Sequence, residues 1–97
     1  MQVQQFYNKN QFIIKDTDNN AIYFQSYNSK IAKLDNNTNT LYIFEDWNYS
    51  NTTLKHFYLF LNDYCYSVYK LINNSTNKRK CFEKMLDTEQ AGIKIIK

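Results

Sequence analysis

The side chains that could carry out catalysis are few and far apart in this sequence. His56 is the only histidine, and it stands between Lys55 and Phe57 in a segment with helical spacing. A cysteine–histidine nucleophile pair needs the two side chains within hydrogen-bonding distance. Cys65 follows His56 at a distance of roughly 13 Å along the axis of an unbroken helix. We therefore predict no catalytic site and expect that the protein is not an enzyme.

The acidic residues and the cysteines also lack the spacing of a metal or cofactor site. Residues 16–20 begin like a calcium-binding EF-hand loop, but the central glycine and the final bidentate glutamate are missing. Cys65 and Cys81 stand apart in the sequence, and we interpret them as reduced core thiols. The single glycine, Gly92, cannot form a glycine-rich phosphate loop. The sequence thus predicts neither a metal nor a cofactor.

The one cluster of like charge comprises Lys78, Arg79 and Lys80, followed by Lys84. Lysine and arginine next to a helix supply the sequence-independent part of nucleic-acid binding, because they contact phosphates. The net charge of +3 is too small to require such a partner. Two interpretations stay open: the cluster contacts nucleic acid directly, or it is a solvated face that keeps a small protein in solution.

Four strands are expected in the first half of the chain, over residues 11–16, 21–27, 30–35 and 40–45. Short segments rich in Asn and Asp join them, as in an antiparallel meander. Because strand side chains alternate between two faces, we predict an inner and an outer face for this sheet. The inner face carries Ile22, Phe24, Ala32 and Leu34. The outer face carries Tyr23, Tyr27 and Lys33.

The periodicity changes after residues 50–53, which are all of types that cap helix N-termini. From residue 54 to residue 72 the apolar side chains recur at spacings of three and four, which predicts one long helix. Asn62 and Asp63 could break this helix, and residues 64–69 could be extended instead. Trp47, just before the helix, is expected in the core, although it could also stack on a base, anchor a protein contact or pack against the start of the helix.

A shorter helix is expected over residues 77–86, and its apolar side is predicted to bury Cys81, Phe82, Met85 and Leu86. Gly92 permits a turn, after which residues 93–96 could close the sheet as a last strand. Strands followed by helices are the order of an α+β fold, and 97 residues is the length of one domain. We predict a single α+β domain over residues 1–97: a four-stranded antiparallel β-meander, one long or broken helix and a shorter helix.

Tyrosine is the commonest aromatic residue, with 9 copies in the chain. It is enriched at interfaces because it buries a large area and keeps a polar tip. If the helices cover the inner face, the outer face stays open to solvent, as antiparallel sheets allow. We therefore predict that Tyr23, Tyr27 and Lys33 bind a partner. The second set of candidate binding residues is Lys78, Arg79 and Lys80.

Two segments resemble a group of small phage-associated proteins. They are Ser26-Tyr27-Asn28-Ser29-Lys30-Ile31-Ala32, and Trp47 with Ser50-Asn51-Thr52-Thr53-Leu54-Lys55-His56 and Phe60-Leu61. The group carries the pattern SYNTxVA, then W-S-x-T-T-L-R-H and F-L, and the resemblance covers roughly residues 10–62. The chain departs from it at Ser29, where the group has threonine, and at the inserted Asn48 and Tyr49. The resemblance implies a phage or mobile-element origin and supplies no catalytic residues.

Short phage proteins without catalytic residues often resemble inhibitors of host defence, among them anti-CRISPR proteins. This resemblance implies a non-enzymatic inhibitor that binds a host protein or nucleoprotein complex, such as a CRISPR-Cas effector. The alternative is a small nucleic-acid-binding module. Because the sequence shows no signal peptide and no apolar run of about 18 residues, we expect a cytoplasmic protein in a bacterial host cell, without a membrane partner. We expect a monomer or a small homo-oligomer.

Overall fold

The first half of the chain forms an antiparallel meander of five strands in the computed structural model, which describes residues 1–97. The strands are β1 (Gln2–Phe6), β2 (Asn8–Asp16), β3 (Ala21–Ser26), β4 (Ser29–Asp35) and β5 (Thr40–Ile43). Each of them pairs with the next in sequence. The predicted meander is confirmed, and β1 precedes the four strands that were expected.

The complete sheet has seven strands, because a C-terminal hairpin adds β6 (Thr88–Gln90) and β7 (Ile93–Ile96). The expected number of four was too small. β7 runs parallel to β5, with Leu41 opposite Ile95, and β6 lies at the edge of the sheet beyond β7. Residues 93–96 therefore form the last strand in sequence, as expected, but β6 forms the last strand in space.

The turns rely on residues other than glycine to reach left-handed backbone conformations. Asn20, Asn39 and Asp87 have φ angles of 51°, 52° and 63°. Asn and Asp tolerate this region best among the residues with a side chain. Tyr7 and Tyr27 also have positive φ angles, of 64° and 55°, where bulky residues are rare. In a chain with one glycine, the meander turns therefore depend on Asn and Tyr, and Asp87 serves the connection from α3 to β6.

Four helical segments follow β5: the 3₁₀ turn η1 (Glu45–Asn48) and the helices α1 (Asn51–Tyr64), α2 (Tyr66–Asn73) and α3 (Lys78–Met85). Ser50 caps α1, since its Oγ accepts a hydrogen bond of 3.1 Å from the backbone N–H of Thr53. The prediction of an α+β domain with helices after the strands is confirmed.

The predicted long helix is broken at Cys65, between α1 and α2, and not at Asn62-Asp63. Residues 66–69 are helical, so the extended alternative was wrong. An unbroken helix over residues 51–73 would be roughly 34 Å long at 1.5 Å per residue. That is as long as the whole molecule, whose longest dimension is 33 Å. The change of direction at Cys65 keeps Val68 and Ile72 buried instead of projecting α2 beyond the sheet.

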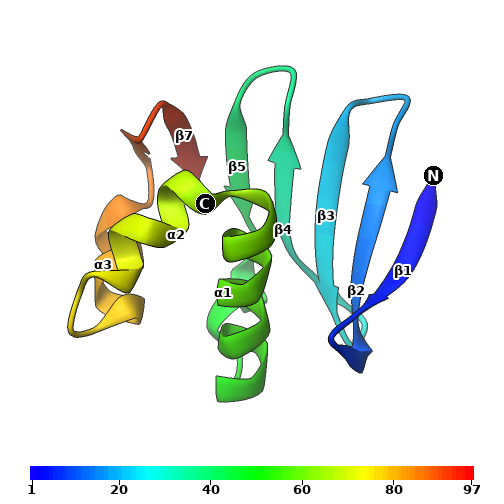
Figure 1. Ribbon diagram of the computed structural model, residues 1–97, viewed down its shortest axis with the longest axis horizontal. Coiled ribbons are helices and arrows are strands. Elements are labelled where there is room, and N and C mark those ends of the chain that lie inside the picture. The colour runs from blue at the N-terminus through cyan, green and yellow to red at the C-terminus, as the bar shows by residue number, and fades with distance from the viewer.

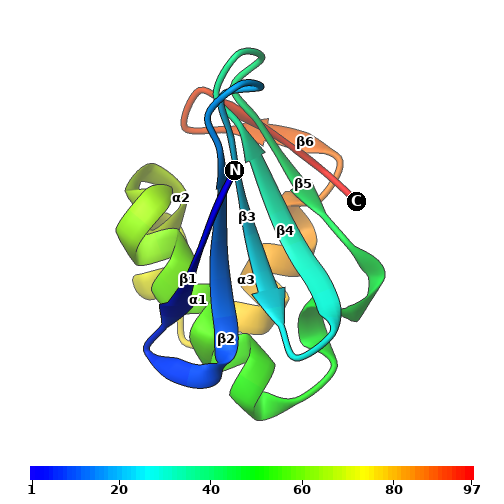
Figure 2. The ribbon, with the colours of Figure 1, turned by 90° about the vertical axis from the view of Figure 1, so that its right-hand side faces the viewer.

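All three α-helices lie on the same side of the sheet, and the other side carries no helix (Figures 1 and 2). The core between the two layers combines aliphatic side chains with a group of aromatic rings. Trp47, Phe57 and Phe82 meet with ring centroids 5.1–5.9 Å apart, and Phe24 of β3 stacks on Phe60 of α1 at 5.7 Å. Trp47 is 1% exposed, which confirms its predicted place in the core.

The shorter helix is confirmed as α3, but only part of its predicted apolar side is buried. Phe82 and Met85 are buried, whereas Cys81 and Leu86 are half-buried. Successive helical residues are separated by about 100° around the axis. Cys81 therefore lies at the border of the face that Phe82 presents to the core, and Leu86 follows the end of the helix.

Candidate functional site

One row of side chains crosses the helix-free face of the sheet in register. Val3 lies opposite Ile14, Ile14 opposite Tyr23, and Tyr23 opposite Lys33. Lys33 lies opposite Tyr42, and Tyr42 opposite Ile96 of β7. Residues directly opposite each other point to the same face. We call this set the open row: Val3, Ile14, Tyr23, Lys33, Tyr42 and Ile96.

The open row is mostly apolar, and its charge is held against aromatic rings. The Lys33 Nζ lies 5.6 Å from the Tyr23 ring centroid and 5.5 Å from that of Tyr42. The Lys30 Nζ lies 4.7 Å from the Tyr23 centroid. Ammonium groups at such distances are attracted to the ring face. Two cations are thus fixed over a half-buried aromatic surface.

A β-bulge in β4 puts the second lysine on this face. Phe24 pairs with Ala32, but the next residue, Gln25, pairs with Lys30, so Ile31 is an extra residue in β4. Strict alternation from Lys33 would turn Ile31 outward and Lys30 inward. The bulge instead buries Ile31 beside Ala32. Because of the bulge, the side chain of Lys30 lies on the open face, on the same side as Gln25 and Tyr23.

Tyr23 and Lys33 lie where the alternation of the sequence predicted them, directly opposite each other on the outer face. Tyr42 was not named as a candidate, although its alternation with the buried Leu41 and Ile43 carried the same signal. Ile96 could not be found, because its place depends on the parallel pairing of β7 with β5. Lys30 was missed because a bulge has no alternation signal.

Tyr27 lies elsewhere, and the prediction that it belongs to a strand was wrong. β3 ends at Ser26, and Tyr27 occupies the two-residue turn before β4 with its side chain 51% exposed. Its backbone N–H donates a hydrogen bond of 2.7 Å to the carbonyl oxygen of Asn10, which fixes the turn against β2. Tyr27 therefore lies at one end of the sheet and not in the open row.

Tyr27 lines a half-open cavity of about 660 Å³ between the β3–β4 turn and the N-terminus of α1. Hydroxyl groups join the two sides: the Thr53 Oγ1 lies 3.1 Å from the Ser26 Oγ and 3.2 Å from the Ser50 Oγ. Asp46 and Tyr49, which precede α1 in the chain, also line the cavity. The β3–β4 turn and the start of α1 thus meet in space, and the hydroxyl groups of Ser26 and Thr53 connect them.

His56 is buried in α1, and its Nδ1 donates a hydrogen bond of 2.9 Å to the Thr52 carbonyl oxygen. This bond holds the ring within its own helix. Cys65 is buried as a free thiol at the junction of α1 and α2, and burial raises its pKa to about 11. A thiol with a raised pKa is a poor nucleophile at neutral pH. Both residues therefore fit structural positions.

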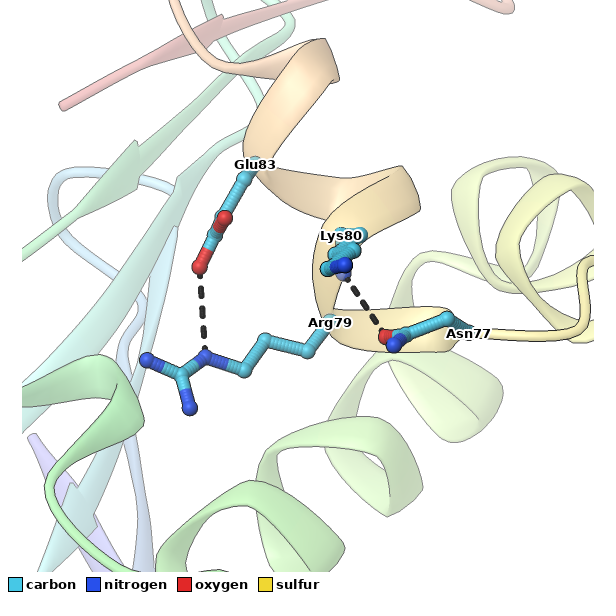
Figure 3. Close-up of polar contacts among 4 residues, drawn as sticks. All are labelled: Asn77, Arg79, Lys80 and Glu83. Carbon is cyan, nitrogen blue, oxygen red and sulfur yellow. Dashed lines mark hydrogen bonds and ion pairs between the residues drawn. The ribbon is translucent and has the colours of Figure 1, made fainter.

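The basic cluster lies in the first turn of α3, and Figure 3 shows the polar contacts of Arg79 and Lys80. The Arg79 Nε forms an ion pair of 3.2 Å with the Glu83 Oε1, and the Lys78 Nζ lies 6.0 Å from the Tyr58 ring. Lys80 is exposed, and its backbone N–H donates to the Asn77 Oδ1 at 3.0 Å. Tyr23 and Lys33 therefore lie on the helix-free face of the sheet, whereas the basic cluster lies on a helix of the covered side.

No three side chains of His, Cys, Asp or Glu come together in a group that could hold a metal ion. No helix combines the length and the apolar character that crossing a membrane requires.

A family of unknown function (DUF8033) matches the chain over residues 1–84. The match includes the meander, α1, α2 and most of α3, while β6 and β7 lie beyond its end. Comparisons with curated proteins and with solved structures gave no match. Function therefore has to be inferred from the surface of this chain.

Proposed function

The chain belongs to the family of unknown function (DUF8033), and we propose that it acts by binding a protein partner through the open row, without catalysing a reaction. The observation that carries this proposal is the uncovered row itself. Ile14, Tyr23, Tyr42 and Ile96 lie in register on the face that no helix covers. Contiguous apolar and aromatic side chains on a surface are typical of binding sites.

The charged residues on this face indicate which charge the partner's surface should carry. Lys30 and Lys33 are the cations nearest the aromatic centre of the row. Three acidic residues lie on the same face. Asp16 and Asp35 engage their own turns, since Asp16 accepts from Asn19 and Asp35 from the backbone of Asn37, and Glu89 of β6 lies opposite Lys94 of β7. We therefore propose a partner surface that is apolar and carries a carboxylate above the two lysines. Such complementarity fixes orientation and speeds association.

The proposed consequence of binding is inhibition by occupancy. The resemblance to phage-associated proteins motivates a host defence complex, such as a CRISPR-Cas effector, as the partner. A protein that has no nucleophile in contact with a base can still inhibit a complex by covering the surface through which that complex binds its target. The open row thus sets the surface chemistry of the proposed partner, and the resemblance suggests the kind of host complex.

Site-specific photocrosslinking tests the proposal. A photoreactive phenylalanine derivative replaces Tyr42 in one variant and Tyr49 in the control, where the side chain is 77% exposed and lies outside the row. We expect the Tyr42 position to crosslink one protein partner in host cells and the Tyr49 position not to do so. The partner is then purified, and its affinity for the Tyr23→Ala/Tyr42→Ala variant is measured.

The double substitution should weaken binding by about 30-fold or more, which is ~2 kcal/mol. Tyr27→Ala is the matched control, because Tyr27 is an exposed tyrosine outside the row. A loss confined to Tyr27→Ala would place the interface at the cavity instead of the open row. Unchanged affinity of the double variant, with its fold intact by circular dichroism, would refute binding through the open row.

A second candidate function is nucleic-acid binding by Lys78, Arg79 and Lys80, and one observation favours it. Positive charges in the first turn of a helix oppose its dipole, at a cost of about 0.3–1 kcal/mol each. The first turn of α3 carries these three and no acidic residue. A charge that destabilises its own helix is easier to explain if it has a ligand. Changing all three to Gln should abolish binding to duplex or single strands, and binding should fall steeply with salt.

A further inference from the structure

The two edges of the sheet differ in how they are protected against pairing with another strand. β6, at one edge, has three residues, includes Glu89 and follows Asp87. β1, at the other edge, has five residues and no charge in Gln2–Phe6. Natural sheets protect their edges with charges, proline, bulges or short strands, because an edge offers unpaired N–H and C=O groups. Over Gln2–Gln5, β1 has none of these protections.

β1 is also accessible along its whole regular part. Gln2, Val3, Gln4 and Gln5 are all exposed, and Val3 is 62% exposed. Their register with β2 is continuous from Gln2 to Gln5, and the irregularity comes only between Gln5 and Phe6. Figures 1 and 2 show β1 at the border of the sheet, with no other element along its outer side. A strand could therefore add to β1 without displacing any part of the fold.

We propose that β1 pairs with β1 of a second copy of this chain, antiparallel across a two-fold axis, so that the two sheets become one. Two-fold pairs are the commonest arrangement of homo-oligomers. A strand that faces its own copy must not bring like charges together, and the neutral sequence Gln-Val-Gln-Gln meets this condition. The net charge of +3 per chain resides on other elements.

A two-fold axis through Gln4 gives a pairing that suits the side chains. Val3 then lies opposite Gln5 of the second copy, and both belong to the open face. The two Gln4 residues meet on the helix side, where their amide groups can donate to and accept from each other. Each Val3 loses solvent exposure at the junction. The open row of one copy then continues into that of the other.

This inference is independent of the proposed function, because it rests on the edge of the sheet and not on its open face. It also specifies which edge pairs. The acidic, short β6 edge should stay free in the dimer. Lysine substitutions at the two edges can therefore be compared: those in β1 should weaken the dimer, and one in β6 should not.

Light scattering coupled to size exclusion, over a range of protein concentrations, tests the pairing. The wild-type chain should approach twice its mass of 11.7 kDa at high concentration and dissociate on dilution. Gln2→Lys with Gln4→Lys should raise the dissociation constant at least tenfold, because lysines on the two strands then lie near one another. Gln90→Lys, which adds a lysine to β6, should leave the dimer unchanged.

Circular dichroism and urea unfolding establish that the variants fold. A second measurement uses a mixture of ¹³C-labelled and unlabelled chains, in which isotope-filtered NMR should detect contacts between Val3 of one copy and β1 of the other. A wild-type chain that is monomeric at every concentration refutes the proposal. So does a dimer that the two β1 lysines do not weaken, or one without contacts between the β1 strands.

Discussion

Phe24 and Tyr23 are neighbours in β3 and occupy opposite faces of one sheet. Phe24 is fully buried and stacks on Phe60 of α1. Tyr23 is half-buried, and its ring contacts two lysine side chains instead of a second layer. The covered face therefore stabilises the fold, whereas the open face, which also carries aromatic residues, is expected to contribute less. Burial by another element, and not residue type, decides which aromatic residues hold the molecule together.

The largest expected effect on stability comes from replacing one of these two neighbours, Phe24, and comparing it with the replacement of Tyr23. Phe24→Ala should lower the free energy of unfolding by about 3–5 kcal/mol, because it removes a buried ring and leaves a cavity. Tyr23→Ala should cost less than about 1 kcal/mol, the range of a cross-strand pair on an open face. Urea denaturation of both variants measures the difference. Equal losses would mean that the open face is part of the core.

The second largest effect is a pH-dependent change of about 2–3 kcal/mol in the free energy of unfolding, which we expect from the buried thiol of Cys65. Burial raises the pKa of Cys65 from 9.0 to about 11. The folded state therefore keeps the proton at pH values where the unfolded chain loses it. This contribution to stability is complete below about pH 9 and is lost as the pH rises toward 11.

Unfolding measured between pH 8 and 11 should show this loss in the wild type and a smaller one in Cys65→Ala. Burial also raises the pKa values of Tyr58 and Tyr64. Both tyrosines remain in the variant, so the comparison isolates the thiol. Parallel pH profiles for the two proteins would contradict the assigned role of burial.

The covered face also contains one unfavourable polar group, and its replacement should have a smaller effect of the opposite sign. Gln11 is 0% exposed, and neither atom of its amide forms a hydrogen bond with the protein. An unpaired buried polar group costs about 1–3 kcal/mol. Gln11→Met, which keeps the length of the side chain, should raise the free energy of unfolding by about 1 kcal/mol. A destabilised Gln11→Met would show that the amide has a partner such as a buried water.

The smallest expected effect belongs to the open face. Lys33→Met keeps most of the side-chain length and removes the ammonium group that lies over Tyr23 and Tyr42. An exposed cation–aromatic contact contributes about 0.5–1 kcal/mol, so stability should fall by no more than that. A loss above 2 kcal/mol would contradict the view that this face adds little to folding. Thermal unfolding at low and high salt measures the change.

These faces were predictable to different degrees. The alternation of apolar and polar residues placed Phe24 inward and Tyr23 outward, because a period of two is a local property of the sequence. β1 was missed because Gln2–Gln5 has no apolar face of its own, and the segment is a strand only through its pairing with β2. The break at Cys65 was missed because it depends on the size of the sheet that the helix must cover, which is a property of the whole fold.

The candidate site was predictable where one strand sufficed and unpredictable where strands had to be combined. Tyr23 and Lys33 follow from alternation within β3 and β4. Lys30 reaches the same face only through the bulge at Ile31, and Ile96 only through a strand that arrives from the other end of the chain. Tyr27 was misplaced because its segment contains neither Gly nor Pro to mark the turn.

The parallel pairing of β7 with β5 has a consequence for the order of folding. The meander pairs strands that are neighbours in sequence, whereas Thr40 meets Lys94 only after the chain has passed through every helix. Closing a loop of that length costs roughly 3–4 kcal/mol of chain entropy, which must be offset before the contact forms. Contacts between distant residues slow folding. During synthesis on the ribosome, the meander can form early, but the sheet stays incomplete until residues 93–96 have emerged.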